Sequence, residues 1–453
     1  MLFLTVLFIN VQATMTQLGQ EKERGIKNAL SLKGMKKEAF WCTWMVSEGA
    51  VLSVSTVIVT VGAKLVGVIE HTSMLHFYGT VWIYGISLIL LAFVLSSFFS
   101  EAKTMFIAAA IMLIFFSVIG YVTELLFIRQ DIFGMPYAVN LMMFMFSPVP
   151  FAHLTWTLSS GELMGRGWEE GLTRLEWDIE HDYYYEAYFF LVFDCFLYVG
   201  LTLVFDSLFG DPLSFGRGPT NSDDIVPTPG MGISIKGLSK LYRWKEKASG
   251  WAGILRVKTA QEVQAVDGLD LDVEKNQICC LLGHNGAGKT TTMVLLAGLE
   301  APDSGSATVG GYDIIKDREG MRQNLGMCPQ HDILYDELTN MEHLLLYGGI
   351  QGLSDDECAS EADRLLLAVG LTSKAGDLAC QMSGGQRRRL SLAVSLIGGP
   401  AAAFLDEPTT GMDPHNRQLC WKLLQLEKLT CTILLTTHSM GQFYAEMIYD
   451  SSI

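Results

Sequence analysis

Four long apolar stretches in the first half of the chain most constrain how it can fold. They cover residues 41–68, 79–99, 104–128 and 187–209, and each carries few charged side chains. A helix needs about 20 apolar residues to cross a bilayer, so every stretch is long enough to span one. A buried helix of a soluble protein could explain one stretch, but four of them favour a membrane domain. We therefore expect a bundle of transmembrane helices over residues 1–209.

Two shorter apolar segments have alternative interpretations. Residues 136–155 contain Pro148 and Pro150, and proline interrupts the hydrogen-bond ladder of a helix. A re-entrant hairpin is therefore favoured there over a further span. Residues 1–13 are either a signal peptide that is cleaved after Ala13 or part of a spanning helix. No basic residue precedes this run, although a signal peptide usually carries one.

The charge of the loops predicts how the spans are oriented. Residues 69–78 contain no Lys or Arg, whereas residues 14–40 contain Lys22, Arg24, Lys27, Lys33, Lys36 and Lys37. Cytoplasmic loops carry an excess of basic residues, so the basic segment is expected in the cytosol. The span at 187–209 then also ends in the cytosol. The sequence thus predicts a multi-pass membrane protein with a cytosolic second half, and leaves open whether it lies in the plasma membrane or in an organelle membrane.

The second half of the chain has the pattern of a soluble α/β domain. Residues 210–231 are rich in Gly, Pro, Ser and Asp and are typical of a linker. Short apolar runs then alternate with helical patterns over residues 232–440. The net charge of −16 argues against nucleic acid as a partner, because phosphate backbones attract basic surfaces. The nine cysteines contain no CxxC spacing, which favours reduced thiols in a reducing compartment.

One segment of this domain fits the phosphate-loop pattern GxxxxGK[ST]. It reads Gly283-His284-Asn285-Gly286-Ala287-Gly288-Lys289-Thr290. An apolar strand-like run precedes it and a helical run from Thr291 follows it, which is the context that the motif needs. Glycines let backbone N–H groups converge on phosphate oxygens, and a helix N-terminus favours negative charge. We expect Lys289 to reach the β- and γ-phosphates of ATP and Thr290 to bind Mg²⁺.

A second apolar run ends in two carboxylates. Residues 401–405 precede Asp406 and Glu407, and ligands of α/β domains bind at the carboxyl ends of buried strands. We expect Asp406 to hold Mg²⁺, directly or through water, and Glu407 to act as the general base toward water.

Further motifs resemble those of ATP-binding cassette (ABC) transporters, in the same chain order. The segment Met382-Ser383-Gly384-Gly385-Gln386 resembles the ABC signature, usually LSGGQ, and Gly411-Met412-Asp413 resembles the D-loop. Gln330 resembles the Q-loop glutamine, and His438 the switch histidine. Tyr242 stands where such cassettes place an adenine-stacking aromatic, although residues 243–263 lengthen its distance to the phosphate loop. The resemblance implies a P-loop NTPase fold in which Gln330 also contacts Mg²⁺, His438 supports hydrolysis, and Thr291, Ser383, Gly384, Gly385 and Gln386 join the nucleotide site.

A narrower resemblance is to the A subfamily, the lipid exporters. LLGHNGAGKTTTM and FLDEPTTGMDP resemble its first cassette, and MFSPVPFAH and FDCFLYVGLTLVFDSLF resemble its membrane segments. This match implies that residues 1–14 are a partial span of a first half-transporter. It also implies a lipid substrate. Residues 441–453 depart from the subfamily, whose cassettes continue with further strands and helices after the switch histidine.

The resemblance also implies a partner. ABC proteins hold ATP between the phosphate loop of one cassette and the signature of another, so this chain is expected to pair with a second cassette, in a homodimer or with another half-transporter. Closure of that pair would pass to the spans through residues 20–37. Two alternatives stay open, namely a membrane-bound regulatory ATPase and an inactive truncated fragment. The identity of the lipid and the direction of its movement are not given by any residue pattern.

Overall fold

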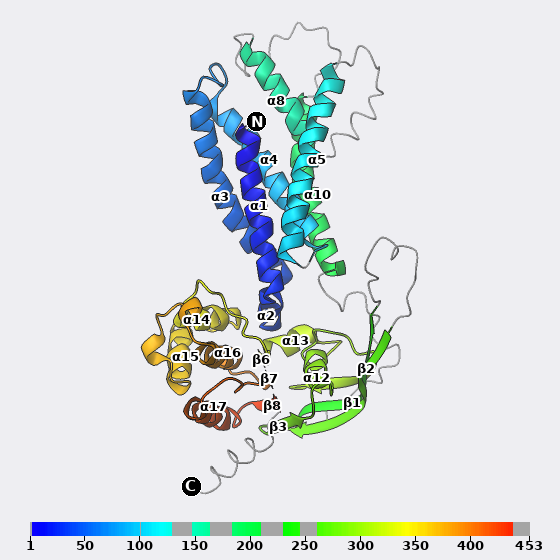
Figure 1. Ribbon diagram of the computed structural model, residues 1–453, viewed down its shortest axis with the longest axis vertical. Helices are drawn as coiled ribbons and strands as arrows, with labels where there is room; N and C mark the ends of the chain where they lie inside the picture. Colours follow the sequence, from blue (N-terminus) through cyan, green and yellow to red (C-terminus); the bar gives the residue numbers. More distant parts are fainter. Residues whose placement is uncertain are drawn as a thin grey trace. The chain divides into compact units, whose positions relative to one another are not determined.

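The computed structural model describes residues 2–99, 101–128, 147–163, 184–209, 230–244 and 261–437 (Figure 1). The chain divides into two compact units. One contains residues 1–24 and 37–210, and the other contains residues 25–36 and 211–453. A short segment from the basic loop, residues 25–36, therefore belongs to the same unit as the second half of the chain.

The first unit is helical. The helices that the structure describes in this unit are α1 (Leu2–Glu23), α3 (Lys37–Leu65), α4 (Met74–Ser96), α5 (Ala102–Ile128), α8 (Pro148–Leu163) and α10 (Tyr184–Phe209). Within the described residues, three helical segments are long and apolar enough to cross a membrane, namely Lys37–Leu65, Met74–Ser96 and Glu186–Asp206. The expected stretch at 104–128 lies within α5. Of the expected partial span at 1–14, residues 2–14 lie within the longer helix α1.

Helix α4 lies at the centre of this unit, in contact with α1, α3, α8 and α10. The contacts are mainly apolar and aromatic; the rings of Tyr84 and Phe151 stack with centroids 3.8 Å apart. Two polar contacts also cross between helices. Thr14 Oγ1 donates to Glu48 Oε2 at 2.7 Å, and Trp41 Nε1 donates to Asp206 Oδ2 at 3.2 Å. Hydrogen bonding of this kind offsets the cost of burying carboxylates away from water.

The expected hairpin at 136–155 is described only in its second part. Residues 136–146 lie outside the described residues, whereas Pro148 is the first residue of α8. Proline is tolerated in the first helical turn because its missing N–H would have no intrahelical partner there. Both prolines of this segment stand in that turn, so they mark the start of a helix.

The described residues of the second unit form two four-stranded sheets. The antiparallel sheet has the order β2-β1-β4-β5 and consists of β1 (Met231–Trp244), β2 (Gln261–Glu274), β4 (Ser304–Val309) and β5 (Tyr312–Asp313). The parallel sheet has the order β3-β8-β7-β6 and consists of β3 (Ile278–Leu282), β6 (Leu325–Cys328), β7 (Ala402–Asp406) and β8 (Thr432–Thr437). The central strands β7 and β8 are almost wholly buried. β7 is apolar up to Asp406, and β8 carries the apolar run 433–435 between threonines, which suits a parallel sheet covered on both faces.

Helices and short 3₁₀ turns are the other regular elements that the structure describes in this unit. They are α2 (Ile26–Leu32), α12 (Lys289–Leu296), α13 (Arg318–Gln323), α14 (Asn340–Ile350), α15 (Asp355–Ala368), η2 (Thr372–Lys374), η3 (Ala379–Gln381), α16 (Gly384–Leu396) and α17 (Pro414–Glu427). Helix α16 packs on β6 and β7, and α12 contacts β2, β4 and β7. One apolar core joins both sheets, with Ile233 from β1 and Phe404 from β7 fully buried in it. Leu32 of α2 belongs to the same core.

The two antiparallel strands β1 and β2 were only partly expected from the sequence. The apolar run at the start of β1 was predicted, but β1 continues to Trp244 and pairs with β2 in a long hairpin. Tyr242 lies opposite Val263 in that hairpin. Residues 243–263 lengthen the distance between Tyr242 and the phosphate loop along the chain. The described ones among them, residues 243–244 and 261–263, form the paired ends of β1 and β2.

Candidate active site

The predicted phosphate loop connects β3 to α12, so that it leaves the carboxyl end of a parallel strand and enters a helix. Gly288 is the N-cap of α12 and has φ +86°. A Cβ atom at this position would lie 2.1 Å from the carbonyl oxygen of Ala265. Glycine is required here both for the left-handed backbone and for the close approach to β2. The backbone N–H groups that follow stand at a helix N-terminus, which suits an anion.

Lys289 reaches back over the loop that precedes it. Its Nζ donates to the carbonyl oxygen of Gly283 at 2.6 Å and to that of His284 at 3.0 Å. These bonds hold the ammonium group across the curve of the loop. The positive charge therefore lies where the N–H groups of the loop and of α12 converge, and all of these groups favour an anionic ligand.

Thr290 and Asp406, which are far apart in the sequence, meet at the end of the parallel sheet. Thr290 Oγ1 donates to Asp406 Oδ2 at 2.9 Å. The other carboxylate oxygen of Asp406 accepts a hydrogen bond from Thr436 Oγ1 in β8. Hydroxyl and carboxylate oxygens are the ligands that Mg²⁺ prefers, so these residues fit a magnesium ion.

The protein oxygen atoms available for such an ion are few. Among the residues that the structure describes, no group of three or more His, Cys, Asp or Glu side chains could hold a metal ion. Mg²⁺ typically takes one or two carboxylates and completes its octahedral shell with water and substrate phosphates. Thr290 and Asp406 provide few protein ligands, as is usual at Mg²⁺ sites that are completed by water and phosphate oxygens.

Glu407 follows directly after β7 and is held in a strained backbone conformation. Its φ is +53°, and a left-handed conformation costs a residue with a Cβ atom about 1–2 kcal/mol. Its N–H donates to Thr436 Oγ1 at 3.1 Å, and its carboxylate oxygen Oε2 accepts from Thr410 Oγ1 at 3.1 Å. Strained residues persist where their surroundings fix them and are frequent at functional sites. The carboxylate is thus aimed by backbone geometry and by one hydroxyl.

The predicted signature segment forms the start of α16. Ser383 is the N-cap, and its hydroxyl accepts from the N–H of Gln386 while Gln386 Oε1 accepts from the N–H of Ser383 at 2.9 Å. This reciprocal pair is a capping box. Gln386 therefore has a clear structural role, whereas Gly384 and Gly385 stand in the first turn with exposed or half-exposed backbone. Their N–H groups face no intrahelical partner and are available to an anion.

The remaining predicted site residues are placed as follows. Gln330 is exposed and comes shortly after β6, at the same sheet edge as Asp406, since both strands are parallel neighbours. Tyr242 lies in β1, and its hydroxyl donates to Glu300 Oε2 at 2.7 Å. Partial burial, together with that hydrogen bond, raises the pKa of Tyr242 to about 12. His438 lies outside the described residues.

Two residues of the site were missed by sequence reasoning. Thr436 binds both Asp406 and the backbone of Glu407, and Thr410 binds the Glu407 carboxylate. Thr436 stands in the run that precedes His438, so the only local signal was a hydroxyl at the end of an apolar strand. Its role depends on pairing of β7 with β8, which a local pattern does not reveal.

Comparison with known proteins agrees with both halves of the chain. The family described as "ABC transporter" matches residues 266–410, and the family described as "ABC-2 family transporter protein" matches residues 1–204. A similar human protein, retinal-specific phospholipid-transporting ATPase ABCA4, is 31% identical over 96% of this chain and 20% of its own length. The human phospholipid-transporting ATPase ABCA3 is 33% identical over 93% of this chain and 26% of its own length.

The chain thus spans about a fifth to a quarter of the length of these curated relatives. Among solved structures, an ATP-binding subunit of an ABC transporter is 25% identical, with a TM-score of 0.40 over 47% of this chain and 82% of its own.

Proposed function

Since the chain belongs to the ABC transporters and is of their A-subfamily type, we propose that its cassette hydrolyses ATP to drive the movement of a lipid across a membrane. The family match establishes an ATP-binding ABC ATPase cassette that follows an ABC-2 membrane domain. The observation that carries the proposed chemistry is the cluster in which Thr290 contacts Asp406 and Glu407 follows at once.

Each residue of the cluster has a defined task in this proposal. The loop from Gly283 to Thr291 and the ammonium of Lys289 bind the phosphates. Thr290 and Asp406, with Gln330, would hold Mg²⁺, which neutralises charge on the phosphate oxygens when it is bound. Glu407 orients water and accepts its proton. His438 supports the same step, and Tyr242 stacks on the adenine ring.

A second cassette completes the site. ABC cassettes dimerise, and we propose that Ser383, Gly384 and Gly385 of one cassette face the phosphates held by the phosphate loop of its partner. The support is the start of α16, where N–H groups of the first turn lack intrahelical partners. Gln386 contributes by holding Ser383 in the capping box.

The membrane substrate is proposed from the relatives. Two of them are phospholipid-transporting ATPases by name, and the spans of this chain carry exposed apolar side chains such as Val54 and Ile58 of α3, which suits contact with acyl chains. Helix α2 is the proposed connection between the cassette and the spans. Leu32 in the apolar core and Arg322 Nη1, which donates to Ser31 Oγ at 3.1 Å, support this role.

The hydrolysis test compares the purified chain in phospholipid vesicles with its Glu407→Gln variant. A general base contributes about 10²–10⁴-fold to the rate, so the variant should lose at least about 100-fold in ATPase rate while it still binds ATP. The exposed residue Glu319 provides the matched control, Glu319→Gln, which should keep the wild-type rate. Hydrolysis by Glu407→Gln at the wild-type rate would refute the base assignment.

The transport test follows fluorescent phospholipids between leaflets of the same vesicles. ATP-dependent movement that Glu407→Gln abolishes supports lipid transport. An ATPase that moves no lipid and whose rate does not respond to the lipids present indicates a regulatory ATPase instead. Absence of ATP binding indicates an inactive fragment.

The partner test mixes two inactive variants, Lys289→Ala and Ser383→Arg. In a mixed homodimer, one of the two composite sites carries both defects and the other carries neither. Mixing should therefore restore ATPase activity that neither variant shows alone. Continued inactivity of the mixture, with wild-type chains active by themselves, would contradict a shared site between two copies of this chain.

A further inference from the structure

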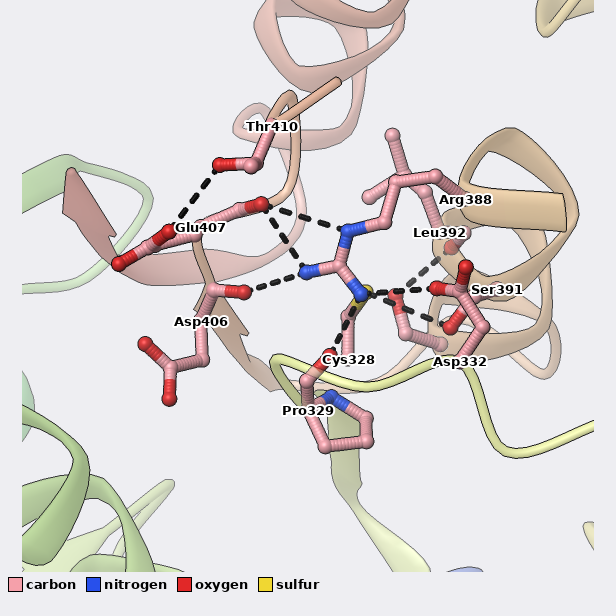
Figure 2. A network of polar contacts seen from close by, with 10 residues as sticks. Cys328, Pro329, Asp332, Arg388, Ser391, Leu392, Asp406, Glu407 and Thr410 are labelled. Atoms are coloured by element: carbon pink, nitrogen blue, oxygen red, sulfur yellow. Dashed lines mark hydrogen bonds and ion pairs between the residues drawn. The ribbon is translucent and has the colours of Figure 1, made fainter. Parts of the chain in front are cut away.

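One buried arginine contacts several parts of the candidate active site at once. Arg388 lies in the second turn of α16, and only 4% of its side chain is exposed. Its Nη1 donates to the carbonyl oxygen of Pro329 at 2.6 Å and to Asp332 Oδ1 at 2.9 Å. Figure 2 shows the guanidinium group between these residues and the end of β7.

The other side of the same guanidinium binds the backbone that carries the two catalytic carboxylates. Nη2 donates to the carbonyl oxygen of Glu407 at 3.0 Å and also to that of Asp406. Nε donates to the Glu407 carbonyl at 3.3 Å. These bonds of Nη2 and Nε all reach backbone carbonyl oxygens, so none of them uses a carboxylate oxygen of Asp406 or Glu407 (Figure 2).

Each segment that Arg388 contacts carries a residue of the proposed mechanism. Pro329 directly precedes Gln330, and the carbonyl groups belong to Asp406 and Glu407 themselves. Arg388 stands on the helix that begins at the signature residue Ser383. The Arg388 side chain therefore connects α16 to two other parts of the same cassette. One is residues 329–332, here called the Gln330 segment, and the other is the proposed general base Glu407.

The contacts also explain how Glu407 keeps its left-handed backbone. The N–H of Glu407 is held by Thr436, and its carbonyl oxygen is held by Arg388 and by the N–H of Thr410 at 3.2 Å. Both peptide groups that flank the residue are thus fixed, and so is the direction of its side chain. A lysine could not replace these bonds, because a single ammonium lacks the planar, five-donor geometry of a guanidinium.

We propose that Arg388 is a positioning residue that orients Glu407 and couples this base to the Gln330 segment. The proposal rests on the proposed role of Glu407 as the general base. A shift of the Gln330 segment when nucleotide binds moves the carbonyl of Pro329, and the shared guanidinium passes that shift to the carbonyl of Glu407. Asp332 balances the buried charge, which otherwise would be costly to bury.

The test measures ATP affinity and steady-state kinetics for Arg388→Lys and Arg388→Gln in vesicles. Misplacement of a reacting group by about 1 Å can cost about 100-fold in rate. We therefore expect kcat to fall about 10- to 100-fold, with KM and the Kd for ATP changed less than about threefold. The control is Arg364→Met, since Arg364 forms ion pairs with Glu361 and Glu427; its kcat should equal that of wild type.

A second measurement separates positioning from a general structural role. Combined with Glu407→Gln, the Arg388→Lys change should produce no further loss of kcat, because the arginine acts through a base that is already absent. Guanidinium ions added to an Arg388→Ala variant should restore part of its kcat, and the Glu407→Gln variant should gain nothing from them.

Several results would overturn the proposal. They are an unchanged kcat in folded Arg388 variants, a parallel loss of ATP affinity, a full further loss in the Glu407→Gln background, or failure of all three Arg388 variants to fold. The last of these would assign Arg388 a purely structural role. Wild-type hydrolysis by Glu407→Gln is a separate result, which would refute the proposed base and not the contacts of Arg388.

Discussion

Lys33 offers a test of how α2 is held against the cassette. It directly follows α2 and is buried, with only 4% of the residue exposed. Its Nζ donates to the carbonyl oxygen of Ser395 at 3.0 Å, and its own carbonyl accepts from Gln351 Nε2 at 3.2 Å. Burial lowers the pKa of Lys33 to about 7, and an electrostatic effect of Cys431 opposes this shift. A lysine that was counted as a cytosolic charge in the sequence is thus poorly suited to carry one here.

The pH dependence follows from this lowered pKa. Below about pH 7 the lysine is charged in both states, and the folded state bears the full cost of the buried charge. Between about pH 7 and pH 10.5 the unfolded chain holds a proton that the folded chain releases, so stability rises with pH. The gap between these values corresponds to about 4–5 kcal/mol, which is an upper limit because water penetration reduces such penalties. From about pH 7 to pH 9 we expect a gain of about 2–3 kcal/mol.

The perturbation is Lys33→Met, which keeps an unbranched apolar chain and removes the titrating group. It also removes the hydrogen bond to the Ser395 carbonyl, at a cost of about 1–3 kcal/mol. A change in the free energy of unfolding at one pH therefore does not test the pKa. The test is the slope of that free energy against pH. Stability of the wild type should rise with pH over this range more steeply than that of Lys33→Met.

The assay is denaturant or thermal unfolding of the purified full chain, followed at several pH values. The exposed residue Lys422 supplies the control, and Lys422→Met should keep the wild-type slope. Parallel pH curves for the wild type and Lys33→Met would refute the reasoning, because they would mean that burial of Lys33 does not shift its protonation.

Three further outcomes are expected. Gly288→Ala should lower ATP affinity at least about tenfold, measured by equilibrium binding, because the new Cβ would lie 2.1 Å from the Ala265 carbonyl and the left-handed φ resists it. Thr436→Val should lower kcat about tenfold or more with little change in the Kd for ATP, since the hydroxyl orients Asp406 and the Glu407 backbone. Glu162→Gln should lower the melting temperature near neutral pH. Partial desolvation opposes the shift, but hydrogen bonds from backbone N–H groups of residues 70–72 lower the pKa of Glu162 to about 2. That stabilisation is complete above about pH 4.5 and is lost as the pH falls to about 2. The difference in melting temperature between the wild type and Glu162→Gln should therefore become smaller over that range.

Local patterns predicted those parts of the protein that depend on local geometry. The phosphate loop needs left-handed glycines before a helix, and Gly288 is such a residue. The apolar run before Asp406 predicted a buried strand because only apolar side chains suit a strand covered on both faces. The capping box of α16 was not predicted, although Ser383 and Gln386 are three residues apart and form it without any distant contact.

The parts that sequence reasoning missed depend on contacts between distant segments. Strand β2 alternates apolar and polar residues over residues 269–274, but such a pattern does not say which strand is its partner, so its pairing with β1 was not evident. Thr436 acquires its role from the register of β8 beside β7. Lys33 was interpreted through charge alone. Its burial accompanies packing of α2 against α13 and β6 and the bond from Lys33 to Ser395 of α16, which no local pattern records.

Helix α16 explains how a signal at the nucleotide can reach α2. Its N-terminus presents the signature residues, Arg388 holds the base, and the Ser395 carbonyl accepts from Lys33. Arg388 and Ser395 are seven residues apart, which places them about two turns and about 10 Å apart on one side of the helix. We expect this helix of 13 residues to move as one body, so that a displacement at Ser383 is also a displacement at the other two contacts. Engagement of the signature by a second cassette would then act on the base and on α2 through the same element, without a separate relay between them.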